Sequence, residues 1–329
     1  MRSDPYHNNY VIGCAIPCYN GGAATLDVIK KCILYVSYVV VVDDSCPFGT
    51  GSLISSYFYQ FKQVIVIQNP KNMGVGASTK IAFKHLISLN CDVIVKIDAD
   101  GQMNPDLIPS LIDPIFTLNA DVVKGNRFSC PEDISSMPPL RIAGNLALSF
   151  MNKLSSGYWE LFDPTNGFLA FKASVLLRLR FDKLDNRYFF ESDLLFQCAL
   201  SNVFIHQLAI ASIYDGQISS LQPLSEIFSF SKHHLSNFFK RIIYQYFLLD
   251  FNAGSLDILG AVFSWFFLVL VAAKTYYNGI NFNVYATPGV SGLIVLLGST
   301  FIQTLLAFLY YDSTQQPANR RQSTNYKLR

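Results

Sequence analysis

Four short apolar runs, separated by segments of helical pattern, occupy the first third of the chain. The runs are rich in β-branched residues and read VIGCAIP (11–17), YVVVVDD (38–44), QVIVIQN (63–69) and DVIVKIDAD (92–100). Nearly continuous apolar runs of this kind are typical of parallel strands that are buried on both faces. Segments of helix length, such as 23–34 and 76–89, lie between them. This alternation predicts an α/β fold with an open, mostly parallel sheet and helices on both faces.

Two long apolar runs stand near the C-terminal end of the chain. Residues 256–277 contain only Asp257 and Lys274 as charged residues, and residues 288–311 contain none. Each run matches the roughly 20 residues that a helix needs to cross a bilayer. A core helix of a soluble protein is the alternative, but two such helices in succession favour a transmembrane hairpin.

An amphipathic segment, 223–251, directly precedes the first of these runs. Apolar residues recur in it at helical spacing, and basic residues are interleaved with them. The apolar set is Leu235, Phe238, Phe239, Ile242, Ile243 and Tyr246, and the basic set is Lys232, His233, Lys240 and Arg241. A basic, aromatic-rich helix beside a spanning helix is typical of a helix that lies in the membrane interface. The alternative is a soluble helix packed on the preceding domain.

The composition also indicates a chain that is partly embedded in a membrane. Hydrophobic residues make up 51% of the 329 residues and charged residues only 15%, below the roughly 25% of ordinary soluble proteins. This composition and a formal net charge of +2 exclude intrinsic disorder and binding to nucleic acid through bulk positive charge, so no nucleic-acid partner is expected. The predicted order is a globular domain (1–221), an interfacial segment (222–255), two transmembrane helices (256–277 and 288–311) and a polar tail (312–329).

The cysteines and histidines show no ligand or disulfide pattern. Seven cysteines are scattered along the chain without a CxxC pair, and the five histidines lack the spacing of metal ligands. This pattern indicates free thiols in a reducing compartment rather than a disulfide framework or a zinc site. The N-terminal stretch is polar, and the apolar run after it is too short for the core of a signal peptide. The globular domain is therefore expected in the cytoplasm.

Polar residues follow the predicted strands at the point where each strand ends. These positions read PCYN (17–20), DDS (43–45), NMG (72–74) and DAD (98–100). Functional residues of open α/β sheets cluster at the carboxyl ends of the strands. Asp98 and Asp100 can hold a divalent cation, Mg²⁺ or Mn²⁺, through oxygen ligands and leave positions for a diphosphate. An isolated DxD is a weak signal, but this one closes a buried strand and continues into Gly101-Gln102.

The ordered motifs resemble those of the family-2 glycosyltransferases of GT-A fold. More narrowly, they are similar to the polyprenyl-phosphate glycosyltransferases, the group that includes dolichyl-phosphate mannose synthase, over about residues 11–311. The motifs that carry the resemblance are Pro17-Cys18-Tyr19-Asn20, Asp43-Asp44, Asn72-Met73-Gly74, Asp98-Ala99-Asp100-Gly101-Gln102, Gly125-Asn126-Arg127, Asp163 with Thr165-Asn166-Gly167-Phe168, and Tyr188-Phe189-Phe190-Glu191-Ser192-Asp193. The resemblance implies a nucleotide-sugar donor, a polyprenyl-phosphate acceptor and a divalent cation.

The resemblance also implies roles for single residues. The nucleotide-sugar candidates are Pro17, Tyr19, Asn20, Asp44, Asn72, Gly74 and Asp98, and the metal candidates are Asp98, Asp100 and Gln102. The acceptor-phosphate candidates are Arg127, Arg141 and Asn145, in line with the parallel hydrogen bonds that guanidinium groups make to phosphate. Asp163, Asp193 and Glu191 are the candidates for a base or a positioning group, with Asp163 first.

Structural alternatives stand beside several of these roles. Asp44 can cap a helix, Glu191 can pair with Arg187, and the glycine at 74 can be a turn residue. The pattern also departs from the family in the nucleotide pocket. Gly21-Gly22 stands where the family usually has an acidic residue, and Phe48 replaces a later carboxylate. The identity of the nucleotide base therefore stays open.

The sequence thus predicts an integral protein of the inner or plasma membrane that is a metal-dependent, inverting glycosyltransferase. It would move a hexose from a UDP- or GDP-sugar to undecaprenyl or dolichyl phosphate. One alternative is transfer to a sugar hydroxyl of a lipid-linked glycan, in which Asp163 or Asp193 would be a true base. Another is a non-catalytic membrane scaffold. A second copy of the chain and a flippase are further candidate partners.

The distribution of cations predicts the orientation of the hairpin. Lys240 and Arg241 precede the first apolar run, and four cations lie in 320–329 after the second, whereas the loop 278–289 contains no Lys or Arg. Lys274, near the end of the first run, is a mild contrary signal. Because positive residues favour the cytoplasm, both termini are expected there and the loop on the other side.

Thiol labelling with a membrane-impermeant probe tests this orientation in a cysteine-free background. We expect Asn281→Cys to react from outside intact cells and Ser323→Cys to stay unlabelled until the cells are opened. The reverse pattern would place the globular domain away from cytoplasmic sugar nucleotides and contradict the prediction.

Overall fold

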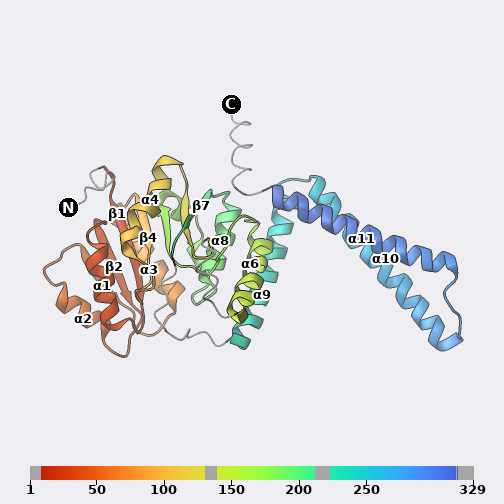
Figure 1. The fold of residues 1–329 in the computed structure, drawn as a ribbon, viewed down its shortest axis with the longest axis horizontal. Helices are drawn as coiled ribbons and strands as arrows, with labels where there is room; N and C mark the ends of the chain where they lie inside the picture. Colours follow the sequence, from red (N-terminus) through yellow and green to blue (C-terminus); the bar gives the residue numbers. More distant parts are fainter. Residues whose placement is uncertain (1–8, 130–138, 212–222, 316, 318–329) are drawn as a thin grey trace.

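The computed structural model describes residues 9–129, 139–211, 223–315 and 317 (Figure 1). Within the helices, the side chains of residues 139–141 and 223–228 are outside that description. The side chain of Arg141, the thiol of Cys130 and most of the predicted polar tail therefore lie outside the described part.

Among the described residues, seven strands form one sheet in the order β3-β2-β1-β4-β6-β5-β7. The strands are β1 (Ile12–Cys18), β2 (Tyr38–Asp43), β3 (Val64–Gln68), β4 (Val93–Lys96), β5 (Val122–Asn126), β6 (Leu169–Lys172) and β7 (Ile205–Ala209). Strand β1 runs parallel to β2 and β4, β2 to β3, and β5 to β7, whereas β6 is antiparallel to both β4 and β5. The predicted α/β class with a mostly parallel sheet is confirmed.

The antiparallel strand β6 brings one loop to the edge where the parallel strands end. Leu169, its first residue, pairs with Lys96, the last residue of β4. The chain just before β6 therefore runs along the carboxyl edge of the sheet. The predicted motif that ends in Gly167-Phe168 lies there, next to the ends of β4 and β5.

Helices cover both faces of the sheet, as the apolar strands require. They are α1 (Gly22–Cys32), α2 (Thr50–Tyr57), α3 (Val75–Ser88), α4 (Ile108–Thr117), α6 (Pro139–Ser156), α7 (Ala173–Leu176) and α8 (Phe190–Leu200), with 3₁₀ turns at Pro105–Leu107 and Phe181–Lys183. In β2, Val39 and Val41 enter one apolar core with α1, α2 and α4, while Val40 and Val42 enter a second core with α3, α7 and α8. This two-sided burial explains why the strands read as unbroken apolar runs.

The last two helices form a hairpin that projects from the globular part of the molecule (Figure 1). They are α10 (Ala253–Phe282) and α11 (Pro288–Thr314), and they pack against each other. Their most apolar windows have mean hydropathies of 2.2 and 2.0 and are only 11% and 6% buried, unlike the core helices of a soluble domain. Helix α10 extends past the predicted end of the apolar run and stops where Asn283 adopts a left-handed φ of 53°. Both helices are thus long and apolar enough to cross a membrane.

Helix α9 (Pro223–Ile243) continues into a π-helical turn (Tyr244–Leu248) and has an inverted pattern of burial. It packs on α6 and α8 with a stripe that is largely polar and buried, formed by His234, Asn237, Arg241 and Gln245. The opposite stripe is apolar and more than half exposed, formed by Leu235, Phe239 and Ile243. The structure corrects part of the sequence interpretation here, because Arg241 of the basic set and Ile242 and Tyr246 of the apolar set are buried within the protein rather than available to a membrane interface. Sequence spacing alone does not show which stripe of a helix faces the protein.

The contact of α3 with the turn at 185–187 generates a stability prediction. A methyl group at Gly76 would overlap the carbonyl oxygen of Asp185 and lie 2.8 Å from Cβ of Phe190. We expect Gly76→Ala to lower the free energy of unfolding by about 2 kcal/mol, because backbone cannot yield as a flexible side chain does. Thermal unfolding in detergent measures the effect.

Gly144→Ala in α6 is the matched control. A Cβ at Gly144 meets nothing within 4 Å among the described residues. Alanine there should raise helix stability, by up to about 1 kcal/mol. Equal midpoints for both variants would contradict the close packing at Gly76.

Candidate active site

A buried lysine joins two of the predicted carboxylates at the end of β4. Lys96 Nζ lies 2.8 Å from Asp98 Oδ1 and 3.1 Å from Glu191 Oε1, and its side chain is fully buried. Burial by itself would lower the pKa of Lys96, but the two carboxylates outweigh it and raise that pKa above its usual value. The charged ammonium therefore holds Asp98, on the strand end, and Glu191, in the first turn of α8, in one cluster. The sequence reasoning missed Lys96, although a charge inside a buried apolar run already calls for a partner.

A glycine from the loop before β6 makes room for this cluster. A Cβ at Gly167 would overlap Lys96 Nζ and lie 2.9 Å from Asp98 Oδ2. Any larger residue at 167 would have to displace the paired side chains of Lys96 and Asp98. This close approach gives the predicted motif at 165–168 a structural reason.

Asp98 and Asp100 fit a divalent cation that is bound partly by a substrate. Asp98 Oδ1 is paired with Lys96, and Asp100 Oδ1 accepts a hydrogen bond from Gln102 N at 3.0 Å. Within the described residues, Oδ2 of each carboxylate accepts no hydrogen bond, and no cluster of three or more His, Cys, Asp or Glu side chains could hold a metal. Mg²⁺ is usually held by one or two carboxylates, with waters and substrate phosphates as its other ligands. The two carboxylates match that donor set.

The acidic pair at the end of β2 organises the loops beside it. Asp44 is almost fully buried and accepts hydrogen bonds from Asn69 Nδ2 (2.7 Å), Met73 N (2.8 Å) and Gly74 N (2.7 Å). The predicted nucleotide residues Asp44 and Gly74 are thus in direct contact, with Asn72 exposed next to them. Asp44 does not cap the helix that follows.

Asp43 supplies that contact with α2 instead. Its carboxylate accepts hydrogen bonds from Cys46 N and, in the first turn of α2, from Gly51 N. On the neighbouring strand β1, Pro17 is buried within the sheet, while Tyr19 and Asn20 are exposed beyond its end. These two residues are therefore open to a ligand at the same edge.

The glycine at 74 has a structural role that sequence alone left open. Gly74 has a φ of 97°, and a Cβ there would overlap the carbonyl oxygen of Asn186. The space beside the backbone is therefore filled by the turn at 185–187 of the same chain. Lys80 also binds this turn, through Asn186 Oδ1 at 2.5 Å, and the carbonyl oxygen of Leu184 just before it at 2.9 Å.

Two of the catalytic candidates face different partners. Glu191 points to Lys96 rather than to Arg187, so the alternative pairing is wrong. Asp193 accepts hydrogen bonds from Asn237 Nδ2 of α9 (2.7 Å) and from Asp185 N (3.0 Å), and its burial raises its pKa. Residues two apart on a helix do not share a face. The structure therefore does not bring Asp193 to the carboxylate cluster.

Arg127 and Asp163, predicted for different roles, form one ion pair, in which the side chain of Asp163 is 1% exposed and that of Arg127 is 25% exposed. Arg127 Nε lies 2.8 Å from Asp163 Oδ2, and Nη2 lies 2.7 Å from Oδ1. Burial alone would raise the pKa of Asp163, but the guanidinium outweighs it and holds that pKa below its usual range. A carboxylate with a lowered pKa is a weak proton acceptor at neutral pH. The geometry favours the orientation of Arg127 as the task of Asp163.

An apolar pocket lies beside this pair. Its volume is about 260 Å³, and it is lined by Phe128, Ile142, Asn145, Leu146 and Phe162. Phe128 directly follows Arg127, and Phe162 directly precedes Asp163. Of the predicted acceptor residues, Asn145 therefore lines the pocket and Arg127 adjoins a lining residue in the chain, while Arg141 occupies the first turn of the helix that carries Asn145.

Lys124 is a second buried lysine that the sequence reasoning missed. It is 1% exposed, and its Nζ donates a hydrogen bond to the carbonyl oxygen of Asn166. Burial lowers the pKa of Lys124 to about 8, against the opposing effect of Asp163 and Glu191. Through this hydrogen bond, Lys124 holds the loop before β6 in place. A lysine within the apolar strand VVKGN was the available signal.

Comparison with known proteins gives consistent matches. The family described as Glycosyl transferase family 2 matches residues 14–180. The UDP-N-acetylglucosamine–dolichyl-phosphate N-acetylglucosaminyltransferase of Methanococcus voltae is 30% identical over 212 residues, which are 60% of this chain and 84% of the relative. The undecaprenyl-phosphate mannosyltransferase of Micrococcus luteus is 30% identical over 50% of this chain and 66% of its own length.

A solved structure shows the same fold. Glucosyl-3-phosphoglycerate synthase from Mycobacterium tuberculosis, crystallised with Mn²⁺, UDP and glucosyl-3-phosphoglycerate, superposes with a TM-score of 0.51 at 18% identity. The match covers 72% of this chain and 82% of that one. The predicted GT-A type of sheet is thereby confirmed.

The Arg127–Asp163 pair generates a pH prediction. Since the pKa of Asp163 is lowered in the folded state, the pair stabilises the fold above the ordinary aspartate pKa, and this contribution is lost as the pH falls through the lowered value. Asp163→Asn should therefore destabilise the protein by about 2 kcal/mol at neutral pH. Below a pH of about 4 the difference from the wild type should shrink.

Thermal unfolding midpoints across this pH range measure the effect. Asp27→Asn is the control, because the Lys30–Asp27 pair is exposed and should contribute little at any pH. A constant difference between Asp163→Asn and the wild type from neutral to acid pH would rule out the lowered pKa.

Proposed function

The chain belongs to glycosyltransferase family 2, and on that premise we propose that it transfers a sugar from a nucleotide donor to the phosphate of a polyprenyl lipid. The observation that carries this proposal is the apolar pocket beside the Arg127–Asp163 pair. A guanidinium next to an apolar pocket suits a ligand with a phosphate head and a hydrocarbon chain. Both named relatives act on polyprenyl phosphates.

The donor is proposed to bind at the carboxyl edge of the sheet. Asp98 and Asp100 would hold a divalent cation there, and a bound cation would neutralise charge on the departing diphosphate. Lys96 keeps Asp98 and Glu191 in fixed positions under this site. The donor would be a UDP- or GDP-sugar, and the exposed Tyr19 and Asn20 lie at the same edge.

The acceptor chemistry explains why a strong base is not needed. A phosphate monoester has a second pKa of about 6, so it is largely ionised and already nucleophilic at neutral pH. One of its oxygens would attack the anomeric carbon from the side opposite the nucleoside diphosphate, which leaves with inversion. Asp163 would keep Arg127 aimed at this phosphate and take no proton.

A sugar-hydroxyl acceptor is less consistent with the same geometry, because it needs a base. Both oxygens of Asp163 accept hydrogen bonds from Arg127, and those of Asp193 accept from Asn237 and Asp185. A pure scaffold would have no use for the clustered carboxylates around Lys96. Polyprenyl phosphate is therefore the acceptor that the site supports best.

The exposed apolar surface of α9 and the hairpin supports attachment to a membrane. The apolar stripe of α9 and the hairpin together expose large hydrophobic side chains next to α6, which also lines the pocket. Contiguous exposed apolar surface of this kind marks contact with a membrane or a partner. The stripe would lie in the interface, and the globular domain is proposed to face the cytoplasm, where sugar nucleotides are made.

Substitution of the metal candidate tests the proposal. With purified protein, a panel of sugar nucleotides and polyprenyl phosphate, we expect nucleoside diphosphate release that EDTA abolishes. Asp100→Asn should keep the fold, because the residue is exposed, and should lower turnover by about 10²-fold.

Asp106→Asn is the matched control. Asp106 is exposed in the next turn and contacts Lys31 and Tyr35 rather than the site, so this variant should keep full turnover. Near-normal turnover in Asp100→Asn, or undiminished release in EDTA, would contradict the proposed mechanism.

A further inference from the structure

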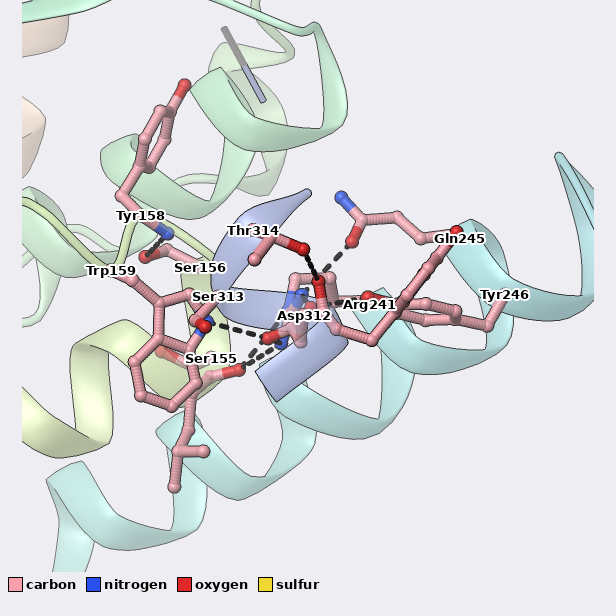
Figure 2. A network of polar contacts seen from close by, with 12 residues as sticks. Ser155, Ser156, Tyr158, Trp159, Arg241, Gln245, Tyr246, Asp312, Ser313 and Thr314 are labelled. Carbon is pink, nitrogen blue, oxygen red and sulfur yellow. Dashed lines mark hydrogen bonds and ion pairs between the residues drawn. The ribbon is translucent and has the colours of Figure 1, made fainter. Parts of the chain in front are cut away.

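A buried ion pair joins the end of the hairpin to the globular domain (Figure 2). Arg241 of α9 and Asp312 in the last turn of α11 have side chains that are 0% and 1% exposed. They meet through two contacts, Nη1 to Oδ1 at 2.6 Å and Nη2 to Oδ2 at 2.9 Å. We call Arg241 and Asp312 the docking pair.

The docking pair is surrounded by hydrogen bonds from three other segments. Asp312 accepts from Tyr246 Oη at 2.6 Å and from Trp159 Nε1 at 2.8 Å. Arg241 donates to the carbonyl oxygen of Leu154, at the C-terminal end of α6, from Nη2 at 2.7 Å. Buried charges that are fully paired in this way favour one arrangement of their elements, since any slippage leaves a charge without a partner.

A glycine also shapes the site of the docking pair. Gly157 has a φ of 77°, and a Cβ there would lie 2.8 Å from Arg241 Nη1. The chain therefore turns directly over the guanidinium as it leaves α6. The hairpin end, α9 and the end of α6 are thus fitted to one another at a single point.

The segment that follows Gly157 reaches the apolar pocket beside the Arg127–Asp163 pair, which we call the acceptor pocket. Trp159 contacts Asp312, and three residues later Phe162 lines the pocket and packs on Phe128 with ring centroids 5.4 Å apart. The same short segment, 157–163, therefore contacts the end of the hairpin and contributes to the wall of the pocket.

The pocket wall has its own supports within the domain. Lys153 Nζ donates to the carbonyl oxygen of Trp159, and Gln207 binds the carbonyl oxygen of Glu160 (2.8 Å) and Phe162 N (3.0 Å). None of these hydrogen bonds involves the hairpin. The pocket should therefore persist when the docking pair is broken.

We propose that the docking pair is a positioning device that sets the height of the acceptor pocket relative to the membrane. This inference rests on the proposed function, since it concerns how a lipid phosphate reaches Arg127. A long polyprenyl chain stays in the bilayer, so its phosphate lies at a fixed depth. A hairpin docked in one position presents the pocket at that depth and raises the effective concentration of the phosphate there.

A loosened joint should therefore affect only membrane-held acceptors. We expect Asp312→Asn to raise KM for a long-chain polyprenyl phosphate in phospholipid vesicles about tenfold, with little change in kcat. The KM for a short, water-soluble prenyl phosphate and the affinity for the donor nucleotide should stay unchanged, because these ligands reach the site from solution. If the docking pair only stabilised the fold, its loss would change the KM values for the two acceptors equally.

Two further variants keep the test decisive. Asp27→Asn removes one partner of the exposed Lys30–Asp27 pair and should leave both KM values at their wild-type level. Trp159→Phe removes one hydrogen bond to Asp312 and keeps the ion pair. It should therefore raise the KM for the long-chain acceptor by less than Asp312→Asn does and leave the KM for the short-chain acceptor unchanged. If Asp312→Asn no longer binds the donor nucleotide and is therefore misfolded, the KM values of Trp159→Phe serve as the test.

The outcomes separate this inference from the proposed function. An equal rise in KM for both acceptors, or no rise for either, overturns the positioning role while the wild type still transfers sugar. A wild-type chain that uses neither acceptor overturns the proposed function, and the positioning role with it.

Discussion

Buried charges need opposite charges beside them, and this constraint decides how the carboxyl edge of the sheet is built. Lys96 cannot stay charged inside the protein without Asp98 and Glu191, so the end of β4 and the start of α8 are held together. In the same way, Asp163 needs Arg127, which connects the loop before β6 to the end of β5. One metal candidate, Asp98, and one acceptor candidate, Arg127, are thus each held in place by an ion pair with a buried partner.

The same constraint acts again where the end of the hairpin meets α9. Arg241 and Asp312 are as deeply buried as Lys96, and their pairing attaches an apolar hairpin to a polar stripe of α9. The burial pattern of α9 follows from this, since the stripe with His234, Asn237 and Arg241 faces the domain and the stripe with Leu235, Phe239 and Ile243 is left outside. On the proposed function both features would be useful, because one exposes apolar surface to the membrane and the other would fix the domain relative to it.

The sequence was sufficient for the first four strands, the two hairpin helices and the strand-end motifs, because these depend on local apolar pattern and on residue types in fixed order, but β5, β6 and β7 were not predicted from it. It was insufficient wherever a side chain chooses its partner across the fold. Lys96 and Lys124 were overlooked inside apolar strands, and Arg241 was counted in the basic set of an interfacial helix although it is buried. Asp193 was grouped with Glu191 although the two lie on different sides of α8. Gly74 and Gly167 serve approaches between distant segments that spacing does not reveal.

The central claim is that a lipid phosphate, held beside Arg127, is the group that receives the sugar. Mass spectrometry of the lipid recovered after incubation with polyprenyl phosphate and the donor measures this directly. The account predicts a product in which the sugar and the polyprenyl chain share a single phosphate, and mild acid should release the sugar and return polyprenyl phosphate. Nucleotide release with unmodified lipid, or a sugar linked to a glycan hydroxyl, would contradict it.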